Sequence, residues 1–515
     1  MHSPPLRHRT NMGIPPFSHT PRGARRWCFV SLPMVCALLS ACTVGPAWHR
    51  PPAPTVATYT ASTAAPASAS STVTPPKLQV GAAVDPQWWR AFGSAPLDRL
   101  VDAALAHNPD IEAAQATVEQ AQHLLRATRG AFYPQVALGL GAERQRSSGA
   151  ASGGRVGPQL YNLYTGQVEV SYAPDVFGLS RLATHDAQAR VDIARYRLAA
   201  ARLAIAGNVV ATTIDLAALD AQLDAMAHTL HDQQQVLDLA RTQYRLGATS
   251  QFDVLTQQSL LASSQAQQVT LQQARDAALH LLATYLGRFP AQAGTLTLPA
   301  IDQLQLPTAL PLSLPSALVH ERPDILAAEA QLRAANAEVG IAVARMYPNV
   351  ELSAAWGVQG NHTDGLFSPA SRIWNVAAGL VQPIFEGGTL KAEKQASEAA
   401  YRGVFADYQS TVLGAFRDVA DVLRALDHDA GLLAAQDDAL QAAQQANQLV
   451  AAQYRAGGVN YLGLMTSQVR LEAARMAQIK ARAQRYADAT ALYVALGGGQ
   501  WPVATAQATT RQGDQ

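Results

Sequence analysis

The side chains that could do chemistry in this chain of 515 residues are few and scattered. His228 and His231 lie three residues apart on a predicted helix and could touch one metal ion, but no carboxylate or cysteine cluster accompanies them. A solvated helix face is the better interpretation of this pair, and of His428-Asp429 as well. The histidines therefore predict no metal site.

The hydroxyl and glycine motifs are equally weak. Ser147, Ser148 and Ser152 lie in a low-complexity loop rather than in the strand-turn-helix context of a nucleophile elbow. The run Gly497-Gly498-Gly499 predicts the end of a helix, not a phosphate cradle. We expect no catalytic residue and no cofactor, so an enzyme is the least favoured class.

Cys42 is the exception. A basic stretch ending at Arg26 precedes an apolar run from Trp27 to Leu39 that is too short to span a bilayer, which predicts a signal peptide over residues 1–41. The following Leu39-Ser40-Ala41-Cys42 resembles the lipobox of bacterial lipoproteins, whose cysteine is acylated and becomes the first mature residue. A chance cysteine behind an ordinary secretory signal is the alternative. The other two cysteines lie in the removed segment, so the mature chain could form no internal disulfide.

Composition narrows the class further. The formal net charge is +1 without long charged runs, so nucleic acid is not an expected partner. Apolar residues reach 48%, mostly alanine and leucine, whereas aromatic residues are only 6%. This composition is typical of helical bundles.

The element that dominates the chain is a proline-free span from Gly178 to Gly287. Leu216 begins an apolar repeat of seven residues that continues through Leu223, Leu230 and Leu237 to Tyr244, with Leu219, Met226 and Ala240 beside it. This pattern predicts a long coiled-coil hairpin that turns at residues 244–250. Its first arm would be about 100 Å long.

Shorter elements precede the hairpin. Residues 42–84 are rich in proline, alanine, serine and threonine and predict a lipidated, extended tether. A short helix is expected from Leu97 to His107, and a longer one from Asn108-Pro109 to Tyr133-Pro134. Alternating apolar residues then predict two strands, around 136–140 and 168–172.

The whole arrangement occurs twice. Pro109-Asp110-Ile111 returns as Pro323-Asp324-Ile325, strands are expected around 350–356 and 376–384, and a second proline-free span follows. The linker from Pro290 to Pro315 is expected to pack around the outside of the rod. We therefore expect a first repeat at 85–300, a second at 301–502 and a disordered tail at 503–515.

The predicted fold is mostly α with membrane β-strands: duplicated helical hairpins and four strands per chain. Four strands cannot close a membrane barrel, and open sheet edges are not tolerated in lipid, so several chains would have to share one barrel. Strands of about ten residues fit an outer membrane span. A barrel continued by a tube of coiled coils is a conduit.

The order of these motifs resembles the TolC-like outer membrane factors, and within them the lipoprotein branch that serves resistance-nodulation-division efflux pumps. The motifs that carry the resemblance are the lipobox with Val44-Gly45-Pro46, Trp88-Trp89, the doubled Pro-Asp-Ile and Tyr-Pro starts, Pro-Ile-Phe-Glu-Gly-Gly and the two Tyr-Arg-x-Gly turns. The resemblance implies a homotrimer in outer membrane lipid with a twelve-stranded barrel, coupled by a periplasmic adaptor protein to an inner membrane pump. It also implies a passive route for drugs or other small molecules.

The resemblance also implies roles for the hairpin turns. Asp253 and Tyr454 match gate positions that would bond to one another. Thr466 stands where relatives in this branch usually carry an acid, and Gly463 occupies the position in the second half that matches Asp253, so the constriction would be less negative than is typical. A helix-start role for Asp253, and a purely conformational role for the glycines, are the alternatives. The expected gate comprises Tyr454, Asp253, Tyr244, Arg245 and Thr466, and the expected adaptor-contact tips are Gly247, Gly457 and Arg455.

Two alternatives remain open. The glutamines between Gln257 and Gln273 suit a water-filled lumen wall, but they suit any exposed coiled-coil face equally. A lipid-anchored periplasmic scaffold without a channel would explain the helices, although it has no use for the strands.

Overall fold

The computed structural model describes residues 44–60, 76–148 and 157–499. Cys42, Ser152, the signal peptide and the C-terminal tail lie outside these ranges. The described chain forms two units: residues 136–179 and 347–382 build a sheet, and the remainder from Gly45 onward builds a helical unit. Each unit is described by itself below.

The sheet unit contains four strands: β2 (Gln135–Ser147), β3 (Gln159–Tyr172), β5 (Asn349–Gly360) and β6 (Arg372–Val381). Their order in the sheet is β2-β3-β5-β6, and β5 pairs antiparallel with both of its neighbours. All four expected strands are confirmed. The last strand ends at Val381 rather than near Ile384, close to Pro383, which has no N–H to donate to a ladder.

Four shorter helices frame the helical unit: α2 (Ala95–His107), α3 (Pro109–Arg129), α6 (Pro315–Glu321) and α7 (Pro323–Ala344). Each carries a proline in its first turn, where a missing N–H costs no hydrogen bond. The predicted helix starts before the strands are therefore confirmed. Four short 3-10 helices lie between these elements: η2 (Gly130–Phe132), η4 (Pro290–Thr295), η5 (Ile301–Gln303) and η6 (Pro369–Ser371).

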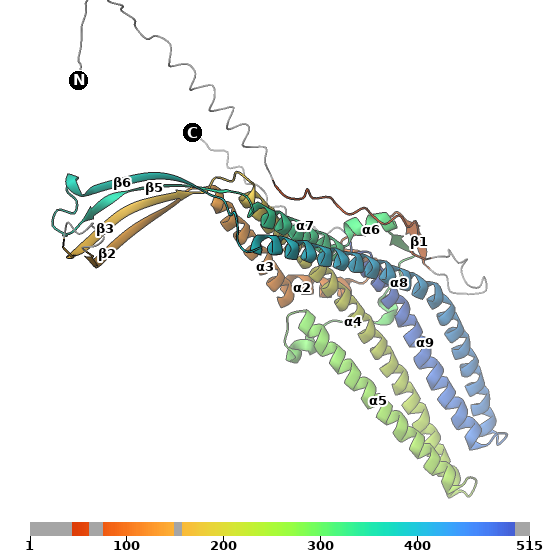
Figure 1. Cartoon of the computed structure of the whole chain (residues 1–515). Coiled ribbons are helices and arrows are strands. Elements are labelled where there is room, and N and C mark those ends of the chain that lie inside the picture. Colours follow the sequence, from red (N-terminus) through yellow and green to blue (C-terminus); the bar gives the residue numbers. More distant parts are fainter. Residues whose placement is uncertain (1–43, 61–75, 149–156, 500–515) are drawn as a thin grey trace, which may run out of the picture. The chain divides into compact units, whose positions relative to one another are not determined.

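Two long hairpins dominate the helical unit (Figure 1). The first consists of α4 (Leu179–Arg245) and α5 (Gln251–Tyr285), and the second of α8 (Thr389–Arg455) and α9 (Tyr461–Ala495). The long arms have 67 residues each and the short arms 35 each. The predicted turns are confirmed, and a long arm measures about 100 Å at 1.5 Å per residue.

The apolar seam of the first hairpin is confirmed over most of its length. Leu216, Met226, Leu237 and Ala240 are buried, but Tyr244 is 46% exposed, so the seam ends one heptad earlier than the sequence suggested. Within the described residues, α4 holds one stretch long and apolar enough to cross a membrane, and 67% of that stretch is buried in the protein. Burial of this kind is typical of a core helix.

A small parallel sheet was not expected. It joins β1 (Lys77–Val80), inside the predicted tether, to β4 (Ala309–Leu312), inside the linker between the repeats. Directly after β1, the 3-10 helix η1 (Trp88–Phe92) places Trp88 and Trp89 at 1% exposure in the core. The C-terminal end of the predicted tether is therefore part of a sheet rather than free of the folded chain.

The first described residues form a strap, defined here as residues 44–60, which packs along α7. The Arg50 guanidinium donates to the Glu329 carboxylate at 2.9 and 2.7 Å, and Tyr59 donates its hydroxyl to the carbonyl of Ser313 at 2.9 Å. Glu329 is only 6% exposed, so the strap supplies the cation that a buried carboxylate needs. The strap is thus part of the folded body.

Candidate functional site

The strand register divides the sheet into an apolar and a polar face. Opposite residues of β5 and its neighbours are Val168–Trp356–Trp374 and Val170–Ala354–Val376 on one face, and Glu169–Ala355–Asn375 and Gln167–Gly357–Ile373 on the other. Trp356 and Val376 are 63% and 75% exposed. An exposed apolar face this continuous has lipid or another protein as its natural partner, and the polar face suits water.

Aromatic residues lie at both ends of the sheet. Trp356 and Trp374 are directly opposite one another near the β5–β6 loop, while Phe177 stacks on Tyr347 at 5.2 Å before β5 begins. Nine residues from Tyr347 to Trp356 span about 30 Å along a strand. With a tilt of about 40°, this gives roughly the 25 Å apolar height of outer membrane barrels with their aromatic girdles.

The two hairpins meet through polar side chains near their turns. Tyr454, one residue before the end of α8, donates its hydroxyl to Gln243 Oε1 of α4 at 3.0 Å. Burial raises the pKa of Tyr454, and the nearby Asp253 carboxylate raises it further, so the phenol stays protonated at neutral pH and remains a donor. Tyr454 is therefore a direct link between hairpins.

A second hydrogen bond between the hairpins joins the two short arms near their starts. Tyr461, the first residue of α9, donates its hydroxyl to Gln257 Oε1 of α5, and Gln257 donates its amide to the carbonyl of Gln233 at 2.9 Å. Gln257 is fully buried and Tyr461 is 5% exposed. Since Tyr454 and Tyr461 also pack edge to face, 6.3 Å apart, the two links form one cluster.

The expected bond between Tyr454 and Asp253 is absent. Asp253 instead completes a capping box at the start of α5, where it accepts from Thr249 Oγ1 at 2.7 Å and from Ser250 Oγ at 2.8 Å. The Thr249 hydrogen bond lowers the pKa of Asp253 most, and bonds from Ser250 add to this. The contacts of Asp253 in the structure are therefore those of a residue that caps the start of a helix.

The remaining turn residues lie at the surface. Gly247 and Gly457 have φ angles of +73° and +76°, and a Cβ at either would meet open space. Arg245 donates to Thr242 at 3.2 Å, and Thr466 returns its hydroxyl to its own helix at Leu462, 2.8 Å away. The glycine angles explain the residue type, and the open space leaves both turns accessible.

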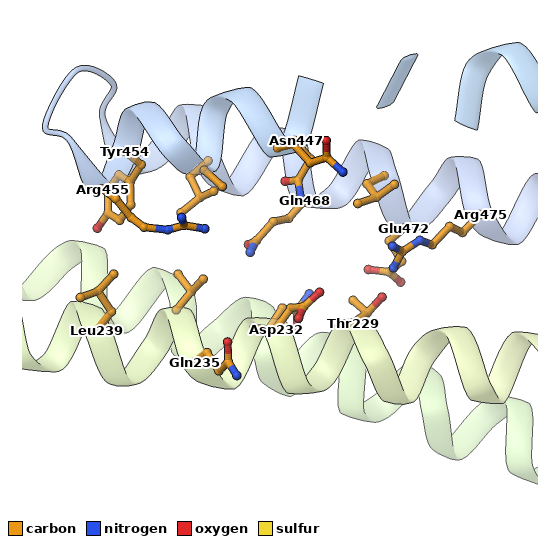
Figure 2. A pocket seen from close by; sticks show the side chains of 16 residues that line it. Thr229, Asp232, Gln235, Leu239, Asn447, Tyr454, Arg455, Gln468, Glu472 and Arg475 are labelled. Atoms are coloured by element: carbon orange, nitrogen blue, oxygen red, sulfur yellow. The ribbon is translucent and has the colours of Figure 1, made fainter. Parts of the chain in front are cut away.

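A polar pocket of about 510 Å³ separates α4 from α8 and α9 behind these turns (Figure 2). Arg455 and Gln468 reach into it from the second hairpin, opposite Asp232 and Leu239 of α4. The buried amide of Gln233 lines the pocket and has no hydrogen-bonding partner at either of its polar atoms. The interface between the hairpins is therefore polar around this pocket, and one buried amide there lacks a hydrogen-bonding partner.

Sequence reasoning missed Gln233, Gln243 and Tyr461. It placed Gln257 on a lumen wall or an exposed helix face, whereas the structure buries Gln257 completely between the hairpins. Gln233 could have been found, because it falls in the seven-residue repeat of Leu219, Met226 and Ala240, where a polar residue is unusual. The two histidines are exposed, His228 lying 3.9 Å from Asp224 and His231 2.9 Å from Gln235.

Asp429 was wrongly assigned to a solvated face. It is 7% exposed, and burial, followed by the charge and hydrogen bond of Asp488 on α9, raises the pKa of Asp429 to about 7. Arg485 opposes this shift only weakly. The second hairpin thus contains a buried carboxyl group, close to a second one, that keeps its proton up to near neutral pH.

Each hairpin is pinned at the end of its short arm by the residue before the Pro-Asp-Ile motif. Asn108 caps α3 and donates Nδ2 to the carbonyl of Tyr285 at 2.9 Å. Its counterpart Arg322 donates Nη1 to the carbonyl of Ala495 at 3.0 Å. Both bonds join the last residue of a short arm to the start of a medium helix.

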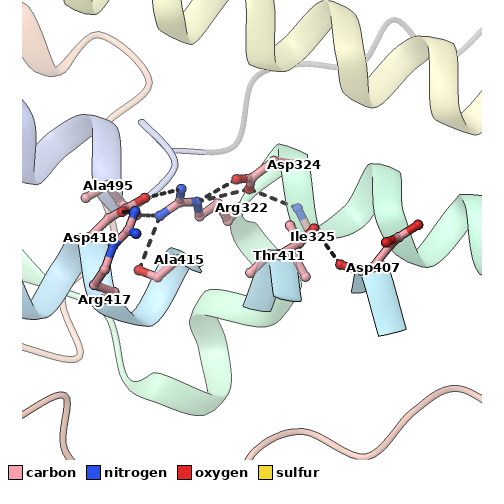
Figure 3. Close-up of polar contacts among 9 residues, drawn as sticks. All are labelled: Arg322, Asp324, Ile325, Asp407, Thr411, Ala415, Arg417, Asp418 and Ala495. Atoms are coloured by element: carbon pink, nitrogen blue, oxygen red, sulfur yellow. Dashed lines mark hydrogen bonds and ion pairs between the residues drawn. The ribbon is translucent and has the colours of Figure 1, made fainter. Parts of the chain in front are cut away.

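Arg322 makes more contacts than Asn108 does (Figure 3). It also donates Nε to Asp324 at 3.0 Å, Nη2 to Asp418 at 2.9 Å and Nη1 to the carbonyl of Ala415 at 3.3 Å. Although burial by itself raises the pKa of Asp418, hydrogen bonds from Arg417 and Arg322 hold it below its usual value. Arg322 therefore fastens both arms of the second hairpin to α7.

Comparison with known proteins gives one consistent result. The sequence pattern of the outer membrane efflux protein family matches residues 100–288 and again 314–498. The pyoverdine export outer membrane protein OpmQ of Pseudomonas aeruginosa is 32% identical over 420 residues, 80% of this chain and 87% of that protein. The toluene efflux pump outer membrane protein TtgF of Pseudomonas putida is 32% identical over 489 residues, 92% of this chain and 97% of that protein.

Solved structures agree with the sequence relatives. The outer-membrane channel OprN superposes with a TM-score of 0.80 at 26% identity, covering 89% of this chain and 99% of that one. With its two-faced sheet, its doubled hairpins and the family pattern across both halves, this chain belongs to the outer membrane efflux protein family and is an outer membrane component of efflux, with its helical part in the periplasm.

Proposed function

We propose that three copies of this chain form one closed conduit that receives small molecules from an inner membrane pump through a periplasmic adaptor. The observation that carries the proposal is the two-faced sheet: four strands with a lipid-compatible face and two unpaired outer edges, β2 and β6. Such edges need partner strands in a membrane. Three chains would supply twelve strands.

The test separates this conduit from a lipid-anchored scaffold without a channel. Protein extracted in mild detergent is expected to run as a heat-modifiable trimer and, in planar bilayers, to give discrete conductance steps. A monomer in detergent, or a trimer that gives no conductance under any voltage, would refute the conduit. The exported compound is proposed only as a class, drugs or other small molecules, because a passive tube leaves selection to the pump.

The turns at Gly247 and Gly457 are proposed as the adaptor contact, together with Arg455. Leu246, Phe252 and Leu255 are 79%, 74% and 55% exposed at and just after the first turn, and they support this proposal because a group of exposed apolar side chains favours a protein partner. Gly457→Asp should lower efflux-dependent resistance while the amount of trimer stays normal. Loss of the trimer itself would instead assign the glycine to folding.

Cys42 is proposed as an acylated anchor. The strap supports this role, because its contacts with α7 at Pro46 and Arg50 would hold the chain close behind an anchor at Cys42. Cys42→Ser should abolish labelling by radioactive palmitate. Persistent labelling in that variant would remove the lipobox interpretation.

The gate is proposed to involve the cluster of Tyr454 and Tyr461 on the second hairpin with Gln243 and Gln257 on the first. Asp253 contributes through its charge near Tyr454 and through the capping box. Tyr244, Arg245 and Thr466 would line the same constriction in the trimer. A direct measurement is the conductance of the double variant Asp253→Ala, Tyr454→Phe, which should exceed that of the wild type; equal conductance would exclude both residues from the gate.

A further inference from the structure

The strap, α7 and the first turns of α8 enclose a groove of about 610 Å³ for which the conduit has no use. Its floor is apolar, and its rim carries charges from one side of α8. The residues that line the groove include Pro46, Val339, Val343, Lys394, Glu398 and Arg402.

The wall formed by the strap is held in place. Gly45 has a φ of +113°, and a Cβ there would lie 2.9 Å from the Cα of Gly340, so only glycine lets the strap approach α7 this closely. Asn336 donates Nδ2 to the carbonyl of Pro46 at 3.2 Å. Together with the Arg50–Glu329 ion pair, these contacts make the groove a built feature of the helical unit.

The charges on the rim alternate. Lys394, Glu398 and Arg402 follow one another at four-residue spacing and therefore lie on one stripe of α8. Lys394 lies 3.4 Å from Glu398, whereas Arg402 has no hydrogen bond or ion pair with another residue of the described chain. A free guanidinium beside a carboxylate offers complementary sites for a zwitterion.

We propose that this groove binds one phosphatidylethanolamine molecule from the periplasmic leaflet of the outer membrane. Arg402 would hold the phosphate, Glu398 the ethanolamine ammonium, and Val339 and Val343 the glycerol and first acyl carbons. Gly45 follows Cys42 by three residues, and a fully extended chain of that length is about 10 Å long. The proposal rests on acylation of Cys42, which is part of the proposed function.

The test uses full-length, acylated protein in nanodiscs, followed by native mass spectrometry of retained phosphatidylethanolamine or phosphatidylglycerol. The wild type should retain phosphatidylethanolamine, and Arg402→Gln should weaken retention about tenfold. Glu398→Gln should remove the preference over phosphatidylglycerol while leaving binding of phosphatidylglycerol unchanged. Lys391→Gln, an exposed cation on the same helix outside the groove, is the matched control.

Three outcomes overturn the proposal. Equal retention by Arg402→Gln and Lys391→Gln would remove the phosphate site, and equal binding of the two lipids by the wild type would remove the zwitterion site. Binding that appears only in Cys42→Ser would mean that the protein's own acyl chains fill the groove. Conductance and trimer content are recorded on the same samples, so a failure of the conduit is distinguished from a failure of lipid binding.

Discussion

The two hairpins have the same length and differ in what their interiors contain. Their helices correspond residue for residue at a constant offset, with 67 and 35 residues in each pair of arms. Where the first hairpin has Leu219 and Ala278, the second has the carboxyl pair Asp429 and Asp488. Geometry was thus retained after duplication, while the second hairpin acquired polar groups that make its packing responsive to conditions.

The turn tyrosines differ in the same direction. Tyr244 of the first hairpin is 46% exposed, whereas Tyr454 at the matching position of the second reaches across to Gln243. The first hairpin therefore presents acceptors and the second presents donors. This division of roles suggests that the second hairpin is the one whose position is controlled by contacts made near the turns.

The largest difference in stability between matching variants should come from Arg322 and Asn108, which hold the ends of the short arms. Arg322→Ala leaves two carbonyl groups without their donor and Asp418 with Arg417 alone, and breaking such a half-buried ion network costs about 3 kcal/mol. Asn108→Ala, at the matching position, loses one cap and one hydrogen bond to the short arm, about 0.5–2 kcal/mol. Melting temperatures in detergent should rank the variants in that order, with Lys480→Ala, at an exposed position of α9, as a control. An equal loss for Arg322→Ala and Asn108→Ala would show that the two repeats are fastened alike.

The carboxyl pair should make the stability of the second hairpin depend on pH. Because the pKa of Asp429 is raised to about 7, the folded state binds its proton more tightly than the unfolded state does. The resulting stability is complete below the unfolded pKa of about 4 and is lost as the pH rises through 7. The wild type should therefore melt at a lower temperature at pH 8 than at pH 5.

Asp429→Asn should remove this dependence and raise the melting temperature at pH 8, with little change at pH 5. Asp438→Asn, on the exposed side of the same helix, is the matched control. Asp429→Leu, which restores the residue type of the first hairpin, should behave like the asparagine variant at pH 8. A wild-type melting temperature that does not vary with pH would refute the raised pKa of Asp429.

Substitutions of the two buried amides of the first hairpin should change the stability by a smaller amount and in opposite directions. Gln233→Leu removes an amide that has no partner and should stabilise the hairpin interface by about 1–3 kcal/mol. Gln257→Leu breaks bonds to Tyr461 and to the Gln233 carbonyl and should destabilise it. Equal losses in melting temperature would mean that the Gln233 amide is satisfied by solvent in the pocket.

The smallest effect is expected at the tyrosines. Tyr454→Phe loses one neutral hydrogen bond, about 0.5–1.5 kcal/mol, and should raise the open probability of single channels. Tyr244→Phe should leave the stability unchanged and raise the open probability less, because the half-exposed Tyr244 makes no hydrogen bond to the second hairpin among the described residues. An equal change in open probability for the two variants would show that the two tyrosines do not differ in their effect on gating.

The architecture could be read from the sequence because its signals are long and repeated. The proline-free spans and the heptads starting at Leu216 fixed the hairpins, and the alternation around Trp356 located a strand. The polar partners could not be predicted, because the choice of Gln243 rather than Asp253 as the acceptor of Tyr454 depends on side-chain geometry. Asp429 was misjudged because its burial depends on the register of α9, and the β1–β4 pair has only four residues per strand.

That small parallel pair has a consequence for the order of assembly. Lys77 pairs with Ala309, and Arg50 contacts Glu329, 279 positions further along the chain. Neither contact can therefore form until the first half of the chain has crossed into the periplasm. Closing so long a loop is entropically costly and slow compared with forming a hairpin. The N-terminal segment would therefore remain open while the first hairpin folds, and its late closure would give chaperones a defined interval in which to act on an incomplete subunit.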